Sequence, residues 1–424
     1  MNPSLLAIVA EGFLSRLSFG VISFALPLYA HHLGLSLTEI GVLTSLNLAI
    51  SLALQPMMGW AADRFGCKRS FNAAIGLRSL VALLLAFAGM PWHLYAIRTA
   101  HGLSKALRDP AANALIAEHG GKKAIASAFA WYATAKSVAG ALGKAVAGIL
   151  LTLTAANFSL VFLIAFVLSA FPILIVARFV QEARPGAQAM RRAGSTDAAS
   201  VSAPPGSEQV TVLRPSLLPF IGLGFMLSST ADMLHGLLPV LATQYAGLSE
   251  AETGMLYMLS TLVILFSGPL FGWLSDNVSR RLVLAVRSGA NIFSSLIFLV
   301  APTFPGFIVG KAVDDIGKAA FKPAWGALMT HVSSFDRCHR ARTMSLMSVG
   351  EDGGAIVGPM LAGILWNAWG IPVLLGVRVL LAVLTEVTAV VLSRSLAKLE
   401  GHEAASGYAT GDTPHPARHE IGSL

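Results

Sequence analysis

PMMGWAADRFGCKR, residues 56–69, recurs 213 positions later as PLFGWLSDNVSRRL, residues 269–282. The two stretches share proline, glycine, tryptophan and aspartate at matching positions. The same offset pairs LGLSLTEIGVL (33–43) with AGLSEAETGML (246–256) and KALRDPAANAL (105–115) with KAAFKPAWGAL (318–328), and an offset of 215 pairs AGIL (147–150) with AGIL (362–365). Four matches in one order along the chain indicate that its two halves arose by duplication of one unit.

The composition is that of a membrane protein. Of 424 residues, 55% are hydrophobic and only 12% are charged, about half the charged share usual in soluble domains. The mean hydropathy is +0.68. Apolar runs of about 20 residues recur along the chain, which is enough to cross a hydrocarbon core of roughly 30 Å. We therefore predict an all-α polytopic membrane protein.

Hydropathy predicts twelve transmembrane helices in two pseudo-symmetric bundles of six. The spans lie at 5–28, 40–61, 71–90, 93–117, 124–153, 158–179, 216–241, 254–274, 282–301, 304–329, 342–366 and 373–394. Residues 181–215 are rich in Ala, Ser, Gly, Pro and Arg, as is typical of flexible linkers. The predicted domains are an N-terminal bundle (1–180), this cytoplasmic linker (181–215), a C-terminal bundle (216–395) and a disordered cytoplasmic tail (396–424).

Basic residues predict the orientation. The loops after odd-numbered spans contain neither Lys nor Arg, whereas the other loops carry clusters at Arg64, Lys68 and Arg69, at Lys122 and Lys123, at Arg184, Arg191, Arg192 and Arg214, at Arg280 and Arg281, and at Arg337 and Arg340. The positive-inside rule then places both termini in the cytoplasm. The net charge of +8 reflects this topology, so we expect no nucleic-acid partner. We expect a bacterial inner membrane, or an organelle derived from it, as the location.

GWAADRFGCKR, residues 59–69, resembles the loop signature of the major facilitator superfamily. Gly59, Asp63, Arg64, Gly66, Lys68 and Arg69 fill that signature, and Gly272, Asp276, Arg280 and Arg281 form a weaker second copy. Arg98, Gly102 and Ala106 resemble the family's fourth-helix motif. The resemblance implies the family's twelve-helix fold and solute transport by alternating access, as in bacterial secondary transporters.

The resemblance also implies a latch between access states, formed by Gly59, Asp63, Arg64, Gly66, Arg69, Gly272, Asp276 and Arg281. Small residues such as Gly59 let membrane helices approach closely, here the second and eleventh spans. Asp63 lies at a helix end, where it can meet basic residues or a positive helix N-terminus. The alternative is that the basic residues of this loop only determine topology.

Ionisable residues form a stripe on the fourth span and another on the tenth. Arg98, His101, Lys105 and Arg108/Asp109 recur every three to four residues, as do Lys311, Asp314/Asp315, Lys318 and Lys322, so each set lines one helix face. An ionised side chain at the bilayer centre costs about 2.5–3.5 kcal/mol. We therefore expect the stripes to face a cavity between the halves, with Arg108 and Lys322 able to extend to the membrane interface.

Two interpretations of these charges stay open. They can form ion pairs that gate the interface between the halves. Alternatively, the substrate contacts Arg98, His101, Lys105, Lys136, Asp314 and Lys318, and protons are carried by candidates among Asp232, His235, Asp315, Glu351, Asp352 and Glu11. A carboxyl group that loses its hydration beside a cavity holds a proton more readily, as a proton carrier requires.

The sequence shows no phosphate-binding glycine loop and no nucleophile constellation, so we expect neither an enzyme nor a cofactor. We predict a monomeric secondary transporter of a small solute, with the basic stripe favouring an anion, working by rocker-switch alternating access and coupled to protons. Its partners are then the small-molecule or ion substrate, protons and membrane lipid, without a resident metal site.

Three alternatives remain. A faint resemblance to bacterial facilitators associated with iron loading of membrane organelles suggests an iron or iron-chelate permease. GGAIVGPMLAG (353–363) resembles the family's antiporter motif, which suggests a drug or metabolite efflux antiporter, although that motif normally lies in the fifth helix, where Lys144 replaces its proline. A membrane receptor or scaffold that transports nothing is the third alternative.

Overall fold

The computed structural model describes residues 3–119, 125–180, 217–277, 280–334 and 340–409, and these residues form helices without any strand. The N-terminal half contains α1 (Pro3–His32), α2 (Leu37–Phe65), α3 (Cys67–Ala86), α4 (Pro91–His119), α5 (Ile125–Leu153) and α6 (Phe158–Phe179). The C-terminal half contains α8 (Leu218–Asp232), α9 (Leu238–Val240), η1 (Leu241–Tyr245), α10 (Glu250–Asn277), α11 (Arg280–Val300), α12 (Phe304–Ser334), α13 (Arg340–Trp369) and α14 (Ile371–Ala409). The predicted linker at 181–215 lies outside the described residues.

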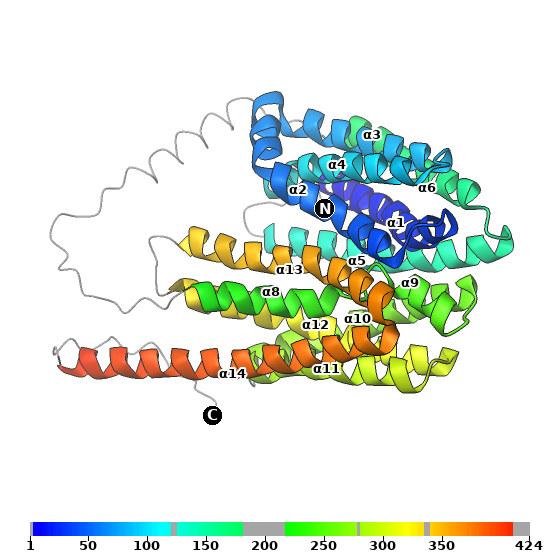
Figure 1. Cartoon of the computed structure of the whole chain (residues 1–424). Coiled ribbons are helices and arrows are strands. Elements are labelled where there is room, and N and C mark those ends of the chain that lie inside the picture. Colours follow the sequence, from blue (N-terminus) through cyan, green and yellow to red (C-terminus); the bar gives the residue numbers. More distant parts are fainter. Residues whose placement is uncertain (1–2, 120–124, 181–216, 278–279, 335–339, 410–424) are drawn as a thin grey trace.

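The two halves lie one above the other in Figure 1 and pack their helices in the same way. In the N-terminal half α1 packs on α5 and α6, α2 on α4, and α3 on α4 and α6. In the C-terminal half α8 packs on α13 and α14, α10 on α12, and α11 on α12 and α14. Each contact in one half therefore has its counterpart six predicted spans later. The predicted fold class, an all-α membrane protein of two pseudo-symmetric bundles, is confirmed.

By length and composition, six helical segments among the described residues can cross a membrane. They belong to α1, α2, α3, α5, α6 and α14. Helices α4 and α12 are equally long but carry the charged stripes, which lower their hydropathy. These two helices lie inside the bundles, packed against α2 and α3 and against α10 and α11, so their charges avoid lipid as expected.

The seventh predicted span is broken rather than continuous. Helix α8 ends at Asp232, residues 233–237 form turns, and the chain continues as α9 and the π-helical η1. Gly236 lies in this break against Thr44 of α2, so close that a Cβ there would be 2.5 Å from the Thr44 Cγ2 atom. Broken helices in transporters occur where backbone borders a cavity instead of lipid.

The halves touch through two symmetric helix crossings, α2 with α13 and α5 with α10. Each crossing is built on a pair of glycines that the sequence repeat relates. A Cβ at Gly41 would lie 3.3 Å from the Cα atom of Gly363, and a Cβ at Gly148 would lie 2.8 Å from the Cα atom of Gly254. Both crossings lie at the loop end, which is the end of the bundle where α1 ends and α2 begins.

Hydrophobic cores also join the halves at that end. One cluster includes Phe24 and Leu43 of the N-terminal half together with Leu237 and Leu365 of the C-terminal half. At the linker end, where α6 ends and α8 begins, each half has its own cluster among the described residues, one around Phe71 and one around residues such as Phe271 and Trp325. The structure is therefore closed at the loop end, and the halves share no described core at the linker end.

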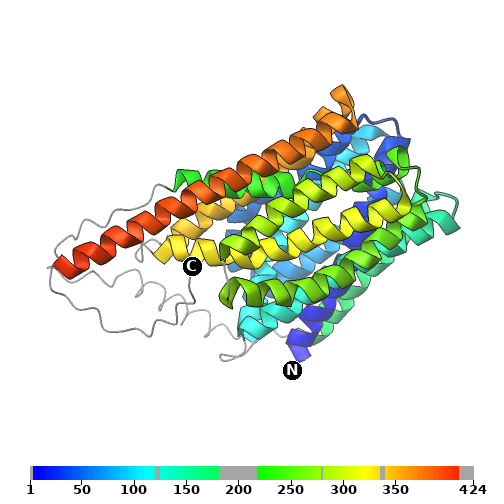
Figure 2. The ribbon, with the colours of Figure 1, turned by 90° about the horizontal axis from the view of Figure 1, so that it is seen from below.

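Helix α14 runs past the predicted domain boundary at 395. It continues to Ala409, past the start of the tail that was expected to be disordered from 396, and Figure 2 shows it projecting beyond the other helices at the linker end. The added stretch is LAKLEGHEAASGYA, rich in Ala, Leu and Glu, which are strong helix formers. Residues 410–424 lie outside the described residues.

Candidate functional site

A cavity of about 230 Å³ lies between the halves. It is called the central cavity here. Helices α1, α2 and α4 line it from the N-terminal half, and the end of α8, the break after it and α13 line it from the C-terminal half. Its polar and charged lining includes Arg16, Asn47, Arg98, Lys105, Asp232 and His235.

A smaller cavity of about 50 Å³ lies within the N-terminal half, and it is called the basic pocket here. Five cationic side chains line it together with one carboxylate, Asp109; the cations are Arg16, Arg78, Lys105, Arg108 and Lys136. Arg16, Phe19 and Lys105 line both cavities, so the basic pocket is a side chamber of the central cavity.

Arg98 joins α4 to α2. Its side chain is buried, and it donates hydrogen bonds to the backbone carbonyls of Leu43 and Thr44 and to Oδ1 of Asn47, each 3.1 Å long. Its Nη1 atom also lies 3.4 Å from Nδ1 of His101. The structure brings both residues to the cavities as the stripe predicted, but most donors of Arg98 already bind the neighbouring helix.

Glu11 and Arg108 form a buried ion pair between α1 and α4. The Arg108 guanidinium donates three hydrogen bonds of 2.7 to 3.0 Å to the Glu11 carboxylate, and the two side chains are 4% and 0% exposed. The expectation that Arg108 extends to the membrane interface is wrong, because Glu11 holds its charge in the interior. As a proton-coupling candidate, Glu11 is already neutralised by Arg108.

Replacing Glu11 by glutamine should lower the free energy of unfolding by about 3 kcal/mol, because a buried charge loses its partner. Thermal or denaturant unfolding of the purified protein in detergent measures this. The pair Glu11→Leu with Arg108→Met removes both charges and should recover most of the loss. Equal destabilisation by the single and the double variant would contradict this account.

The remaining cations of the basic pocket have weaker partners. Nζ of Lys105 lies 3.4 Å from Oδ2 of Asp109, and these side chains are 40% and 32% exposed. Arg16 and Arg78 place their guanidinium carbons 4.7 and 5.4 Å from the centroid of the Phe19 ring. Among the described residues, no carboxylate oxygen lies within ion-pair distance of Arg16, Arg78 or Lys136. The pocket thus has an excess of positive charge.

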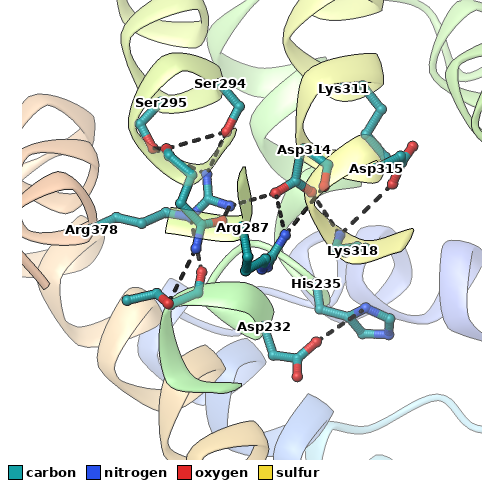
Figure 3. Close-up of polar contacts among 12 residues, drawn as sticks. Asp232, His235, Arg287, Ser294, Ser295, Lys311, Asp314, Asp315, Lys318 and Arg378 are labelled. Carbon is teal, nitrogen blue, oxygen red and sulfur yellow. Dashed lines mark hydrogen bonds and ion pairs between the residues drawn. The ribbon is translucent and has the colours of Figure 1, made fainter. Parts of the chain in front are cut away.

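The acidic pair of α12 lies in a network inside the C-terminal half (Figure 3). The Asp314 carboxylate contacts Arg378 at 2.6 Å, Lys318 at 2.7 Å and Arg287 at 3.7 Å. Asp315 pairs with Lys311. Asp314 and Lys318 were predicted to bind substrate and Asp315 to carry protons, but each already has a partner on its own or a neighbouring helix.

Arg287 and Arg378 were not among the predicted site residues. Both side chains are completely buried. Arg378 on α14 binds Ser294, Ser295 and Asn291 of α11, the Thr230 carbonyl of α8 and Asp314 of α12. Arg287 lies inside the apolar span 282–301, and Arg378 lies inside the apolar span 373–394. A charged residue within an apolar span is a sequence signal that could have identified both.

Asp232 and His235 border the central cavity at the break after α8. Nδ1 of His235 lies 3.8 Å from Oδ1 of Asp232, and the two side chains are 49% and 29% exposed. Glu351 and Asp352 lie on α13 and are partly buried. Glu351 is one helical turn from Ala355, which lines the central cavity. Of the six proton-coupling candidates, Asp232 and His235 are the two that line this cavity.

The latch predicted from the loop signature is placed in part. Gly66 connects α2 to α3 with φ of +96°, a conformation that favours glycine. Arg64 and Arg69 are exposed, and Arg64 lies 5.2 Å from the Trp60 ring centroid. The other acidic and basic latch residues have side chains outside the described set; these residues are Asp63, Asp276 and Arg281. Gly272 also lies outside that set.

Among the described residues, the close helix approach expected at Gly59 is not found. A Cβ at Gly59 would have no atom within 4 Å among the described residues, whereas one at Gly41, on the same helix, would lie 2.5 Å from the Pro359 carbonyl oxygen. Within the part of the chain that the structure describes, helices α2 and α13 therefore approach closely at the loop end. The physical reason is that the halves share their core at the loop end.

Comparisons with known proteins agree with this architecture. The Major Facilitator Superfamily model matches the chain twice, over residues 11–234 and 220–419, which also reflects the duplication. A Bacillus subtilis (strain 168) protein, the uncharacterized MFS-type transporter YttB, is 25% identical over 360 residues, covering 82% of this chain and 85% of its own.

Solved structures share the fold at low identity. A bacterial homologue of the human lysosomal transporter Spinster, in an inward-facing and occupied conformation, has a TM-score of 0.72 and 16% identity over 94% of this chain and 99% of its own. A POT family transporter in complex with 5-aminolevulinic acid has a TM-score of 0.69 and 14% identity over 93% and 96%. With two symmetric bundles around a cavity and a family match along nearly the whole chain, the protein is a multi-pass membrane transporter that belongs to the Major Facilitator Superfamily.

Proposed function

We propose that this secondary transporter moves a compact organic anion by rocker-switch alternating access, coupled to protons. The observation that carries the proposal is the central cavity between two halves that share a described core at one end only. A carrier of this kind works by rocking its halves around a fixed site, so that the site opens to each side in turn.

The charges around the cavities favour an anion. Among the described residues that line the central cavity, Arg16, Arg98 and Lys105 face a single carboxylate, Asp232, and the basic pocket adds further cations. Inside a protein the effective dielectric constant is far below that of water, so this excess attracts anions and repels cations strongly. We infer that a cationic drug or a bare metal cation is disfavoured as the substrate.

Proton coupling is proposed for Asp232 and His235. Glu11 and Asp315 are already held by Arg108 and Lys311, whereas the side chains of Asp232 and His235 are partly exposed at the central cavity. A proton carrier needs contact with water in at least one access state, and the partial exposure of this pair at the central cavity allows it. Both residues flank the break after α8, where a movement of the halves would change their surroundings.

The sidedness follows from the basic loops. With both termini in the cytoplasm, the linker end faces the cytoplasm and the loop end faces the opposite side. We propose that the structure represents the cytoplasm-facing state, in a bacterial inner membrane or an organelle derived from it. The glycine crossings then form the closed outer gate.

Replacing Lys105 by alanine should lower kcat/KM for anion transport by roughly 10- to 100-fold, since a hydrogen bond to a charged group contributes about 1.5–3 kcal/mol. The assay is uptake into proteoliposomes of a panel of labelled mono- and dicarboxylates, phosphate esters and ferric citrate, together with a labelled organic cation, with and without an imposed pH gradient. Lys105→Arg keeps the charge and should retain most of the transport.

Uptake of a cation but no anion would reject the anionic substrate. Anion uptake that is indifferent to the pH gradient and to a protonophore would reject proton coupling. If the reconstituted, folded protein moved none of the panel while a ligand still bound, a receptor that kept the fold would become the better account.

A further inference from the structure

The basic pocket has more positive charge than the protein itself neutralises. Of its five cations, Arg108 is held by Glu11, and Asp109 is the only carboxylate among the described residues that line the pocket. Arg78 is 8% exposed, and its Nε atom has no hydrogen-bond acceptor among the described residues. A buried guanidinium N–H without a partner costs free energy, so an acceptor from a ligand would be stabilising there.

Asp109 is the carboxylate that lies beside Lys105 and Arg108 in this pocket. Its two carboxylate oxygens are 3.4 Å from Nζ of Lys105 and 3.4 Å from Nη1 of Arg108. These distances are longer than those of a tight charge-assisted hydrogen bond, about 2.7–2.9 Å. Asp109 is also one-third exposed. Its hold on Lys105 is therefore loose, unlike the short contacts that Glu11 makes to Arg108.

We infer that the basic pocket binds the anionic group of the substrate, and that Asp109 is an internal competitor that holds Lys105 until the substrate replaces it. The inference rests on the proposed anionic substrate and names the part of the cavity that recognises it. Lys105 is suited to the exchange, because it lines both the basic pocket and the central cavity.

The volumes of the two cavities limit the size of the ligand. One water molecule needs about 10–15 Å³ of cavity volume, so a pocket of about 50 Å³ admits a compact oxyanion such as a carboxylate or a phosphate. The adjoining central cavity of about 230 Å³ would hold the rest of the molecule against Phe19, Leu26 and Pro27. Both volumes lie below the roughly 300–1,000 Å³ of pockets that enclose drug-sized ligands. The substrate is thus a small organic anion with a short, partly apolar body.

A competing internal carboxylate also has a consequence for turnover. In the empty carrier Asp109 reduces the repulsion between Lys105 and its cationic neighbours. When the substrate leaves, Asp109 takes Lys105 back, which lowers affinity and speeds release. Removing the carboxylate should therefore tighten binding of an anion and slow its transport. Removing a cation that binds the anion would instead weaken binding and reduce transport.

The test is Asp109→Asn in the full-length protein, purified in detergent, with binding measured by calorimetry. The probes are inorganic phosphate, which offers the anionic group alone, benzoate and phenyl phosphate, which add a ring, and benzylamine, which is a cation of similar size. We expect Asp109→Asn to bind at least one of the three anions about tenfold more tightly, and benzylamine to remain unbound. Benzoate and phenyl phosphate distinguish a carboxylate substrate from a phosphate one.

Asp232→Asn is the matched control, since it removes the same charge from the central cavity but leaves the basic pocket unchanged. An equal gain in both variants would show a general electrostatic effect and overturn the inference, as would an unchanged or weakened affinity in Asp109→Asn. Asp109→Ser repeats the test if the asparagine variant does not fold. Adding Arg78→Gln to Asp109→Asn should abolish the gain, and persistence of the gain would place the anion elsewhere.

Transport distinguishes this inference from the proposed function. Tightened anion binding without any uptake in proteoliposomes would reject the transport proposal and keep the basic pocket as an anion site. If the protein takes up anions but Asp109→Asn leaves their affinity unchanged, the transport proposal stands and the role of Asp109 as a competitor is rejected.

Discussion

Asp314→Asn is expected to lower the free energy of unfolding by about 5 kcal/mol, at the upper end of what breaking a buried ion pair costs. The Asp314 carboxylate contacts three cations, Arg378 at 2.6 Å, Lys318 at 2.7 Å and Arg287 at 3.7 Å. Both arginines are completely buried, so neither can recover its hydration when the carboxylate is lost. Unfolding of the detergent-solubilised protein, followed by denaturant or heat, measures the effect.

Asp315→Asn is the matched control for this prediction, because it changes the neighbouring residue in the same way. Asp315 pairs with Lys311 and lies 4.0 Å from Lys318, so its loss leaves fewer cations without a partner and should destabilise less. Adding Arg378→Met to Asp314→Asn removes one of the excess charges and should recover part of the loss, which a double-mutant cycle detects. An Asp315 variant as unstable as the Asp314 variant, or strictly additive effects, would refute the network.

Gly148→Val is expected to abolish transport while the protein still folds. A Cβ at Gly148 would lie 2.3 Å from the Glu250 carbonyl oxygen and 2.8 Å from the Cα atom of Gly254. These are backbone atoms of α10 in the other half, so the helices must separate at the loop end. The variant should remain in the state that is open at the loop end. Spin labels on α5 and α10 report the separation, and proteoliposome uptake reports the loss.

The repeat supplies a second version of this experiment. Gly363 on α13 is the counterpart of Gly148, and a Cβ there would lie 2.4 Å from the Leu37 carbonyl oxygen, so Gly363→Val should give the same phenotype. Gly76→Val is the control, since a Cβ at Gly76 meets no atom within 4 Å. Normal transport by both crossing variants would show that the loop end need not close at these glycines.

The fold could be predicted almost completely from the sequence, because hydropathy and the internal repeat both act at the level of whole helices. Spacing along one helix also predicted the shared face of Arg98, His101 and Lys105. Spacing cannot tell which helix lies opposite that face. The partner of Arg108 is Glu11, 97 positions away, and the partner of Asp314 is Arg378, 64 positions away, so these pairs required the tertiary structure.

Two other features also depend on neighbours and not on local sequence. The break after Asp232 occurs where Gly236 meets Thr44 of α2, a contact across the halves that hydropathy cannot register. Gly59 has no close contact among the described residues because the halves meet at the loop end in this access state. The same sequence must also fit the other access state, so sequence alone does not show which contacts are made in each. For these reasons the predicted latch and proton carriers remain predictions, whereas the fold is confirmed.

The uneven distribution of the hydrophobic cores has a thermodynamic and an evolutionary consequence. If apolar contact at the loop end sets the balance between two access states, then a substitution there changes the fraction of carriers that present the site to one side. The apparent dissociation constant of every substrate on that side is divided by the same fraction. Affinity could therefore drift during evolution through residues far from the cavity, while selectivity among substrates stays constant.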